Sequence, residues 1–215
     1  MTERRLLIAT RSAHKLAELR GLLELQRTRL VTLDDLGIGG DVVEDGATFA
    51  DNAIIKARWG AEQSGVATLA DDSGIEVDAL DGRPGVRTRR YAGEDATDDD
   101  NNTRLLEELL ERGAFDPLAR AAHYVCVLAF IDPELPASGP GGSDSPLLSE
   151  GEFRGRIASA PRGQGGFGYD PVFEPDDEPA GGRTVGQMPQ AEKDRRSHRA
   201  AASRAMGERL RRLGY

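Results

Sequence analysis

The chain has 215 residues, a length that suits one domain, or one chain folded as two lobes. It carries 37 Asp and Glu against 28 Lys and Arg, and the net charge of −9 argues against broad nucleic-acid binding, which depends on basic surfaces. The longest apolar run, Val125–Ile131, is too short to span a membrane, and the first residues lack the apolar segment of a signal peptide. The one cysteine, Cys126, lies inside that run. We therefore expect a cytoplasmic protein with a buried, structural thiol.

The first third of the chain alternates short apolar runs with amphipathic segments, which is typical of α/β proteins. Leu6–Ala9 predicts a buried strand, and the leucines between Leu16 and Leu23 share one face of a following helix. A second short strand is expected near Leu30–Val31. Thr48 is a suitable N-cap for a helix over Phe49–Ser64.

The middle of the chain predicts a strand, a loop and a helix. The apolar run Val66–Ala70 is expected to stop at Asp71–Gly74, a turn-like sequence. Residues 81–96 are rich in Gly, Arg and Asp and predict an irregular loop. Thr97, followed by three aspartates, predicts the start of a helix that continues through Leu110.

The last part of the chain contains its most strand-like run, His123–Ile131. A segment rich in Pro and Gly follows and predicts a surface excursion, after which Gly151–Ile157 predicts the return strand of a hairpin. A glycine-rich loop at Gly163–Gly168 precedes a strand at Pro171–Phe173. Ser197–Leu213 predicts a helix with an Arg-rich outer face.

Two segments of the first half place cations where phosphate groups could bind. Thr10–Lys15 offers hydroxyls, backbone N–H groups and a lysine at a predicted helix N-terminus, which suits an anion. A capped helix with a solvated lysine would give the same pattern. Glu44 precedes the next helix, on which Asn52 and Lys56 share one face, so Glu44 could hold a metal while Lys56 binds phosphate. A capped helix with a polar face is the alternative.

Two adjacent carboxylates, Asp71 and Asp72, follow a predicted buried strand. The carboxyl ends of strands are where α/β sheets place ligands, and carboxylates with substrate phosphates suit Mg²⁺. A carboxylate beside that metal could also deprotonate a water. The alternative is a turn that closes a hairpin.

Two further segments carry groups that suit a nucleoside. In Gly163–Pro171 the glycines allow close backbone approach, Phe167 and Tyr169 could stack on a base, and Asp170 could accept from its polar edge. Glu192–Ala200 brings donors to the start of the last helix. Buried aromatics and a solvated helix face are the alternatives.

Taken in this order and spacing, the motifs resemble those of the inosine triphosphate pyrophosphatases, which include dITP/XTP pyrophosphatases. The resemblance covers nearly the whole chain, and Phe167–Pro171 and Ser197–Arg199 are its most specific parts. It implies an α/β fold with an elongated mixed β-sheet and flanking helices, in which residues 1–215 form a single domain of two lobes around a central cleft.

The resemblance also implies a reaction, which is the Mg²⁺-dependent hydrolysis of ITP, dITP and XTP to the monophosphate and pyrophosphate. This reaction removes deaminated purines from the nucleotide pool. The partners it implies are a nucleoside triphosphate and a second copy of the chain in a homodimer, with no nucleic acid and no membrane.

By position, the resemblance implies roles for individual residues. Asp72 would be the proton acceptor, and Glu44 and Asp72 would serve the Mg²⁺, with Asp71 supporting the same acidic site. Two groups of residues would bind the substrate. The triphosphate would contact Thr10, Arg11, Ser12, Ala13, His14, Lys15, Lys56 and Ser73. The nucleoside would contact Phe167, Gly168, Tyr169, Asp170, Lys193, His198 and Arg199. Donors from His198 or Arg199 suit a purine 6-oxo group, whereas a 6-amino group would leave them unpaired.

The sequence departs from the family in the first motif. Arg11, Ser12 and His14 stand where the family usually has a small residue, an asparagine and another small residue. Two alternatives stay open, of which this departure supports only the first. The chain could be a nucleotide-binding sensor without catalysis, or a related enzyme that hydrolyses modified pyrimidine triphosphates. The retained acids oppose the first, and His198 with Arg199 opposes the second.

Overall fold

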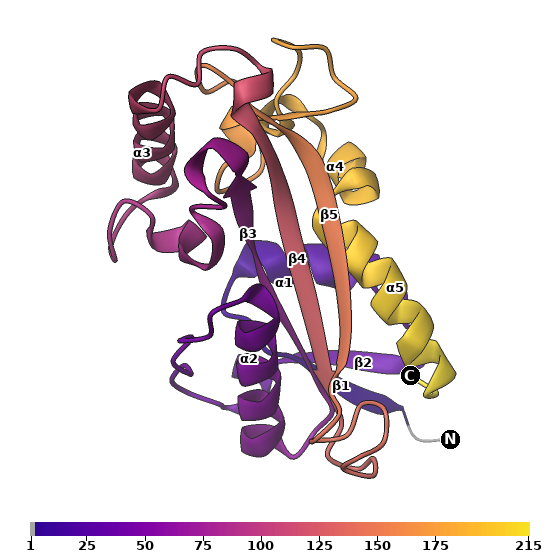
Figure 1. Cartoon of the computed structure of the whole chain (residues 1–215). Coiled ribbons are helices and arrows are strands. Elements are labelled where there is room, and N and C mark those ends of the chain that lie inside the picture. Colours follow the sequence, from indigo (N-terminus) through magenta and orange to yellow (C-terminus); the bar gives the residue numbers. More distant parts are fainter. Residues whose placement is uncertain (1–2) are drawn as a thin grey trace. The chain divides into compact units, whose positions relative to one another are not determined.

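The computed structural model describes residues 3–215 and places six strands in one mixed sheet in the order β2-β1-β3-β4-β5-β6 (Figure 1). The strands are β1 (Arg4–Ile8), β2 (Thr28–Thr32), β3 (Thr68–Val77), β4 (Ala121–Ile131), β5 (Leu147–Ile157) and β6 (Phe173–Pro175). The helices are α1 (Ala13–Leu22), α2 (Phe49–Ser64), α3 (Asp98–Glu111), α4 (Gln190–Arg196) and α5 (His198–Arg212). Strand β1 pairs in parallel with β2 and β3, and β5 pairs antiparallel with β6. The predicted fold class, a mixed sheet with flanking helices, is confirmed.

The chain forms two compact units. The first unit comprises residues 1–72, 126–151 and 199–215, and the second comprises residues 73–125 and 152–198. Strands β3, β4 and β5 each contribute residues to both units.

Helices cover both faces of the strands of the first unit. Leu6 and Ile8 of β1 and Leu69 of β3 share a core with side chains of α1 and α5. Leu7 of β1 and Thr68 of β3, which are adjacent in sequence to these residues, lie against Gly60 of α2. Because successive side chains of a strand point to opposite faces, α1 and α5 cover one face and α2 covers the other.

The second unit has its own core. It is built from β3 residues after Asp72, the apolar face of α3, the first part of β4, and residues 157–188. Leu105 and Leu109 supply that face of α3, which begins at a capping box between Thr97 and Asp100. The same device starts α2, where Thr48 and Asp51 cap the helix reciprocally. These caps confirm the helix starts predicted at Thr48 and Thr97.

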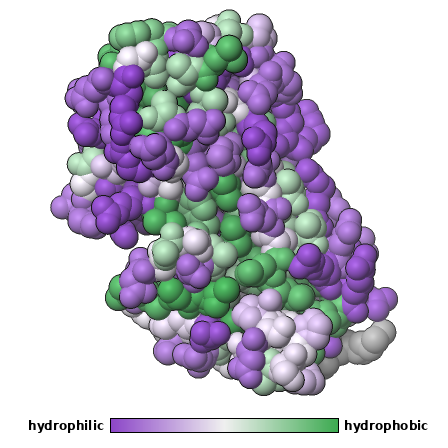
Figure 2. Space-filling view, viewed as in Figure 1, coloured by the Kyte–Doolittle hydropathy of each residue, from purple (hydrophilic) through white to green (hydrophobic). Residues whose placement is uncertain are grey.

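The structure also confirms several other sequence predictions. Cys126 is buried, residues 132–146 form turns, and 81–96 is a loop that contains one 3₁₀ helix, Gly85–Arg90. Among residues 3–215, no helix has the combination of length and apolarity needed to cross a bilayer. The face seen in the space-filling view is largely hydrophilic, with separate apolar patches (Figure 2).

Two strand predictions were wrong. Strand β3 does not stop at Asp71 but runs on to Val77, because cations compensate the acids inside it. Pro171 and Val172 form a 3₁₀ turn, and β6 begins only at Phe173, since proline cannot donate to a sheet ladder. Helix α4 was also missed, and it precedes α5 with Ser197 between them.

We expect two helical glycines of the first unit to respond oppositely to alanine. A methyl group on Gly21 of α1 meets open space, whereas one on Gly60 of α2 would lie 2.8 Å from Thr68 Cγ2. Gly21→Ala should stabilise the protein through helix propensity by up to about 1 kcal/mol. Gly60→Ala gains the same helix propensity but also crowds Thr68. We therefore expect Gly60→Ala to be less stable than Gly21→Ala by about 1–3 kcal/mol, which is the cost of overpacking. Urea denaturation measures both, and equal effects would contradict the packing of α2 described here.

Candidate active site

A buried carboxylate, Asp71, organises one face of the first unit. It lies on β3, is 1% exposed, and accepts from Arg199 Nε of α5 at 2.9 Å and from Lys15 Nζ of α1 at 2.5 Å. Cys126 Sγ donates to the same carboxylate at 3.1 Å, and Arg199 also pairs with Glu18. Burial alone would raise the pKa of Asp71, but the charges of Arg199 and Lys15 hold it well below its usual range. Asp71 is therefore ionised at neutral pH.

The next residue, Asp72, belongs to a different cluster. Lys56 Nζ of α2 lies 2.7 Å from Asp72 Oδ1 and 2.6 Å from Glu44 Oε2, so two carboxylates converge on one ammonium. Asn52 of α2 donates to Asp72 Oδ2 at 3.3 Å and accepts from the backbone N–H of Gly46 at 2.9 Å. Asn52 thereby ties β3 to the segment that carries Glu44.

The electrostatics of this second cluster leave Asp72 more basic than Asp71. Burial raises the pKa of Asp72, although Lys56 and Lys15 oppose the shift. Burial also acts to lower the pKa of Lys56, but Asp72 and Glu44 outweigh it and raise that pKa. Lys56 is therefore charged, and Asp72 is the better proton acceptor of the two adjacent aspartates.

The opposite faces of a strand explain why two adjacent aspartates have different partners. Asp71 points to the face covered by α1 and α5, and Asp72 to the face covered by α2. The sequence predicted that both would serve one acidic site. The structure gives Asp71 a buried ionic role and leaves Asp72 with Glu44 and Lys56.

The segment Thr10–Lys15 caps α1. Ser12 is the N-cap, and its side chain accepts from the backbone N–H of Lys15, while Thr10 Oγ1 accepts from the N–H of Ser12. Ala13 and His14 are exposed in the first turn of α1. The alternative of a capped helix is thus present, but Lys15 is paired with Asp71 rather than solvated.

Arg11 faces a neighbouring loop of the first unit. Its guanidinium donates to Asp34 Oδ1 at 2.7 Å, to Asp41 Oδ1 at 3.3 Å, and to the carbonyls of Ile38 and Gly40 at 2.7 Å each. These residues and the glycines between them line a cavity of about 410 Å³. Arg11 therefore holds residues 38–41 in place, shortly before Glu44, and its predicted contact with phosphate stays a prediction.

In the second unit, Asp170 gathers the nucleoside-binding candidates. It is 3% exposed, and its Oδ2 accepts from Lys193 Nζ of α4 at 2.7 Å and from the backbone N–H of Phe167 at 2.9 Å. Its Oδ1 accepts from the hydroxyl of Tyr124 at 3.2 Å. The ammonium of Lys193 also lies 4.2 Å from the centre of the Phe167 ring. Asp170 thus holds the loop from within, and its predicted contact with the base stays a prediction.

The first turns of α3 brace the same loop. Asp98 accepts from the backbone N–H of Gly168 at 2.6 Å, and Asn102, one turn on, donates to its carbonyl at 3.0 Å. Gly166 has φ +74°, and a Cβ there would lie 2.0 Å from Asp170 Oδ2, so glycine is required. The backbone N–H and the carbonyl of Gly168 are therefore both held in place, and Gly168 directly follows the half-buried Phe167.

The remaining predicted residues are largely buried. Tyr169 is in the core and donates to the carbonyl of Thr88 at 2.7 Å, and Ser73 lies within β3. His198 stacks on Tyr124 with 4.7 Å between ring centres and 6° between the planes. The guanidinium of Arg199 belongs to the Asp71 cluster. Its predicted role in nucleoside binding, like the role of Ser73, stays a prediction.

The chain matches known proteins over nearly its whole length. Residues 6–209 match the model of the Ham1 family. The chain belongs to the Ham1 family. It is 44% identical over 202 residues to the dITP/XTP pyrophosphatase of Halorhodospira halophila, and 45% identical over 204 residues to that of Mycolicibacterium paratuberculosis, with 93–94% of each chain covered.

Solved Ham1 structures share the fold. A HAM1 protein from Coxiella burnetii, 35% identical, superposes with a TM-score of 0.85 over 97% of this chain and 99% of the other. The Ham1 protein of Staphylococcus aureus, 30% identical, gives 0.82 over 98% of this chain and 100% of the other. The resemblance read from the sequence motifs is thereby confirmed.

Several residues of this Ham1-family chain escaped the sequence analysis. Tyr124 is part of a strand-like apolar run and has no local signal. Asp98 and Asn102, four residues apart on one helix face, were recognisable as a pair, but nothing local indicated their target.

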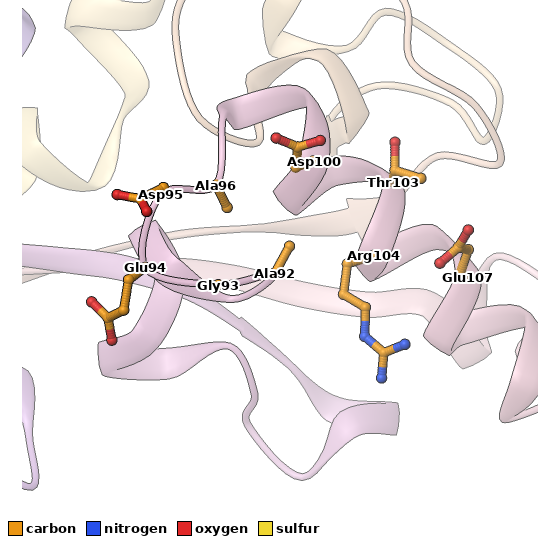
Figure 3. Close-up of a pocket in the computed structure, with 9 residues that line it drawn as sticks. All are labelled: Ala92, Gly93, Glu94, Asp95, Ala96, Asp100, Thr103, Arg104 and Glu107. Carbon is orange, nitrogen blue, oxygen red and sulfur yellow. The ribbon is translucent and has the colours of Figure 1, made fainter.

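A cavity of about 570 Å³ in the second unit is lined by none of the predicted site residues (Figure 3). Its lining residues lie on the loop before α3 and on the outer face of that helix, and they are Ala92, Gly93, Glu94, Asp95, Ala96, Asp100, Thr103, Arg104 and Glu107.

Removing the charge of Asp71 should destabilise the protein. Asp71→Asn leaves the buried Arg199 and the partly buried Lys15 without their shared anion, and we expect the free energy of unfolding to fall by about 3–5 kcal/mol. Because the folded-state pKa of Asp71 is depressed, its contribution is present above the unfolded pKa, near about 3.9, and is lost as pH falls below it. The wild type should therefore lose more stability than the variant on acidification. Chemical denaturation at several pH values measures this, with the exposed Glu62→Gln as control.

Removing the side chain of Arg11 should loosen the loop that it holds. In Arg11→Ala we expect faster amide hydrogen exchange at residues 38–41, with little change in global stability, because exposed ion pairs contribute less than about 1 kcal/mol. Arg5→Ala, an exposed change on β1, is the control. Unchanged exchange in the loop would contradict this role for Arg11.

Proposed function

We propose that the chain is a Mg²⁺-dependent nucleoside triphosphate pyrophosphatase that hydrolyses ITP, dITP and XTP to the monophosphate and pyrophosphate. Membership in the Ham1 family makes it an enzyme that hydrolyses the anhydride bonds of nucleoside triphosphates, as the names of its relatives state. The observation that carries the finer proposal is the convergence of Glu44 and Asp72 on the ammonium of Lys56.

The donors at Glu44 and Asp72 fit a magnesium ion. Both are hard carboxylate oxygens within 2.7 Å of one cation, so the site already accommodates a positive charge. Within residues 3–215, no group of three or more His, Cys, Asp or Glu is arranged to hold a metal. Two protein carboxylates, with water and phosphate oxygens completing the shell, is the arrangement that Mg²⁺ favours in phosphate chemistry. When bound, the ion would neutralise the charge that develops on the phosphates.

The chain's own residues have separate roles in the proposed reaction. Asp72, whose pKa is raised chiefly by burial, accepts the proton of the attacking water. Lys56, whose ammonium lies against both carboxylates, would neutralise phosphate charge. The N-terminus of α1, with Thr10, Ser12 and Lys15, binds the rest of the triphosphate.

The second unit supplies the nucleoside contacts in this proposal. Phe167 provides a face on which a purine can stack, and Lys193 and His198 provide donors, which match the 6-oxo acceptor of hypoxanthine and xanthine. We further propose that the enzyme cleanses the nucleotide pool as a cytoplasmic homodimer. These properties follow from the family resemblance.

A substrate panel tests the activity. Purified protein is incubated with ITP, XTP, ATP, GTP and pyrimidine triphosphates, with Mg²⁺ or with EDTA, and pyrophosphate is measured. We expect pyrophosphate from ITP and XTP only when Mg²⁺ is present. Equal turnover of all substrates, or orthophosphate as the first product, would falsify the proposal. Tight ITP binding without pyrophosphate release would instead identify a sensor.

Asp72→Asn tests the proton acceptor. The amide keeps the size of the side chain but cannot take a proton, so kcat with ITP should fall by about 100- to 10,000-fold. The melting temperature shows whether the variant is folded. Asp45→Asn, an exposed neighbour of Glu44, is the matched control and should retain wild-type turnover. A fully active Asp72→Asn protein would remove Asp72 from the mechanism.

A further inference from the structure

Tyr124 joins two of the nucleoside-binding candidates. It lies on β4 in the second unit and is 7% exposed. Its hydroxyl donates to Asp170 Oδ1 at 3.2 Å, and its ring lies parallel to the imidazole of His198 at 4.7 Å. One side chain therefore contacts two of the candidate residues through two different groups.

The hydroxyl of Tyr124 acts on the Phe167 loop through Asp170. The other oxygen of Asp170 holds the N–H of Phe167 and the ammonium of Lys193. The contact with Tyr124 holds the second oxygen of the same carboxylate and so further restrains rotation about its Cβ–Cγ bond. Burial, with the charge of Asp170 adding to it, raises the pKa of Tyr124 well above its usual value, so the hydroxyl remains a donor.

The ring of Tyr124 acts on His198. A stack with only 6° between the planes fixes the orientation of the imidazole, and hence the directions in which its nitrogens point. Hydrogen bonds weaken steeply away from a linear geometry, so a donor that reads a base must be held in a fixed direction.

We propose that Tyr124 is a positioning residue for purine recognition. Its hydroxyl holds Phe167 and Lys193 in place through Asp170, and its ring orients the imidazole of His198. This inference rests on the proposed function, because it assumes that these side chains bind a purine nucleotide. A role in the core alone is the competing explanation, since the ring also packs on Phe173 with 4.8 Å between centres.

Two substitutions separate the two contacts. Tyr124→Phe keeps the ring and removes only the hydroxyl, so KM for ITP should rise by about three- to tenfold while kcat and the preference for ITP over ATP are retained. Tyr124→Leu removes the ring as well, and the ratio of kcat/KM for ITP to that for ATP should fall by about tenfold or more. That ratio is independent of the fraction of folded enzyme, so a purely structural role would not change it. Tyr124→Met, which fills the space flexibly, replaces the leucine variant if that variant does not fold.

The matched control is Tyr215→Phe in the first unit. Tyr215 is also a buried tyrosine whose hydroxyl donates to a carboxylate, Asp132, at 2.5 Å. This variant should lose stability without a change in KM or in the selectivity ratio. Wild-type KM and selectivity in both Tyr124 variants, or equal changes in Tyr215→Phe, would overturn the proposal.

Binding of monophosphates distinguishes failure of this proposal from failure of the proposed reaction. Calorimetric titration with IMP and AMP measures base selectivity without any hydrolysis. If the wild type prefers IMP but releases no pyrophosphate from ITP, the reaction is wrong and Tyr124 can still be tested by its effect on that preference. If the wild type does not distinguish IMP from AMP, the positioning role is overturned as well.

Discussion

The buried charge of Asp71 is the constraint on which the first unit depends. A carboxylate removed from water is costly unless cations and donors surround it, and here those partners come from three different elements. Lys15 comes from α1, Arg199 from α5 and Cys126 from β4. Satisfying one anion therefore fixes two helices against the sheet. The same requirement places the N-terminus of α1 beside β3, next to the strand position that Asp72 occupies.

The helix caps of this fold could be predicted from the sequence, whereas the contacts between residues far apart in the sequence could not. Thr48 and Thr97 predicted two helix starts correctly, because a capping box is complete within four residues. The end of β3 was misplaced because Asp71 and Asp72 look like a turn until their partners are known, and Arg199 lies 128 residues away. The contact of Tyr124 with Asp170 was not predicted for a related reason, because an aromatic residue in an apolar run does not indicate a partner for its hydroxyl. The family resemblance named candidate site residues without revealing which of them hold the others.

The charges of the first unit explain why a metal suits it. In the cluster around Lys56, two carboxylates, Glu44 and Asp72, face one ammonium. The cluster thus carries an excess of negative charge, and on its own it would repel a triphosphate. A magnesium ion held there, as proposed above, would reverse that sign and would leave Lys56 available for phosphate. The net charge of −9 for the whole chain therefore does not oppose a polyanionic substrate, because the sign that matters is local.

Each unit is organised around one buried aspartate whose acceptor capacity is directed into the protein. Asp71 binds Lys15, Arg199 and Cys126, and Asp170 binds Lys193, Tyr124 and the N–H of Phe167. This use of Asp170 has a consequence for base selection. A carboxylate pointed at the base would favour an amino group, whereas here the carboxylate is turned inward and cationic and aromatic groups surround it. In the proposed function, such surroundings would favour an acceptor on the purine, and the 6-oxo oxygen is the acceptor that separates hypoxanthine and xanthine from adenine.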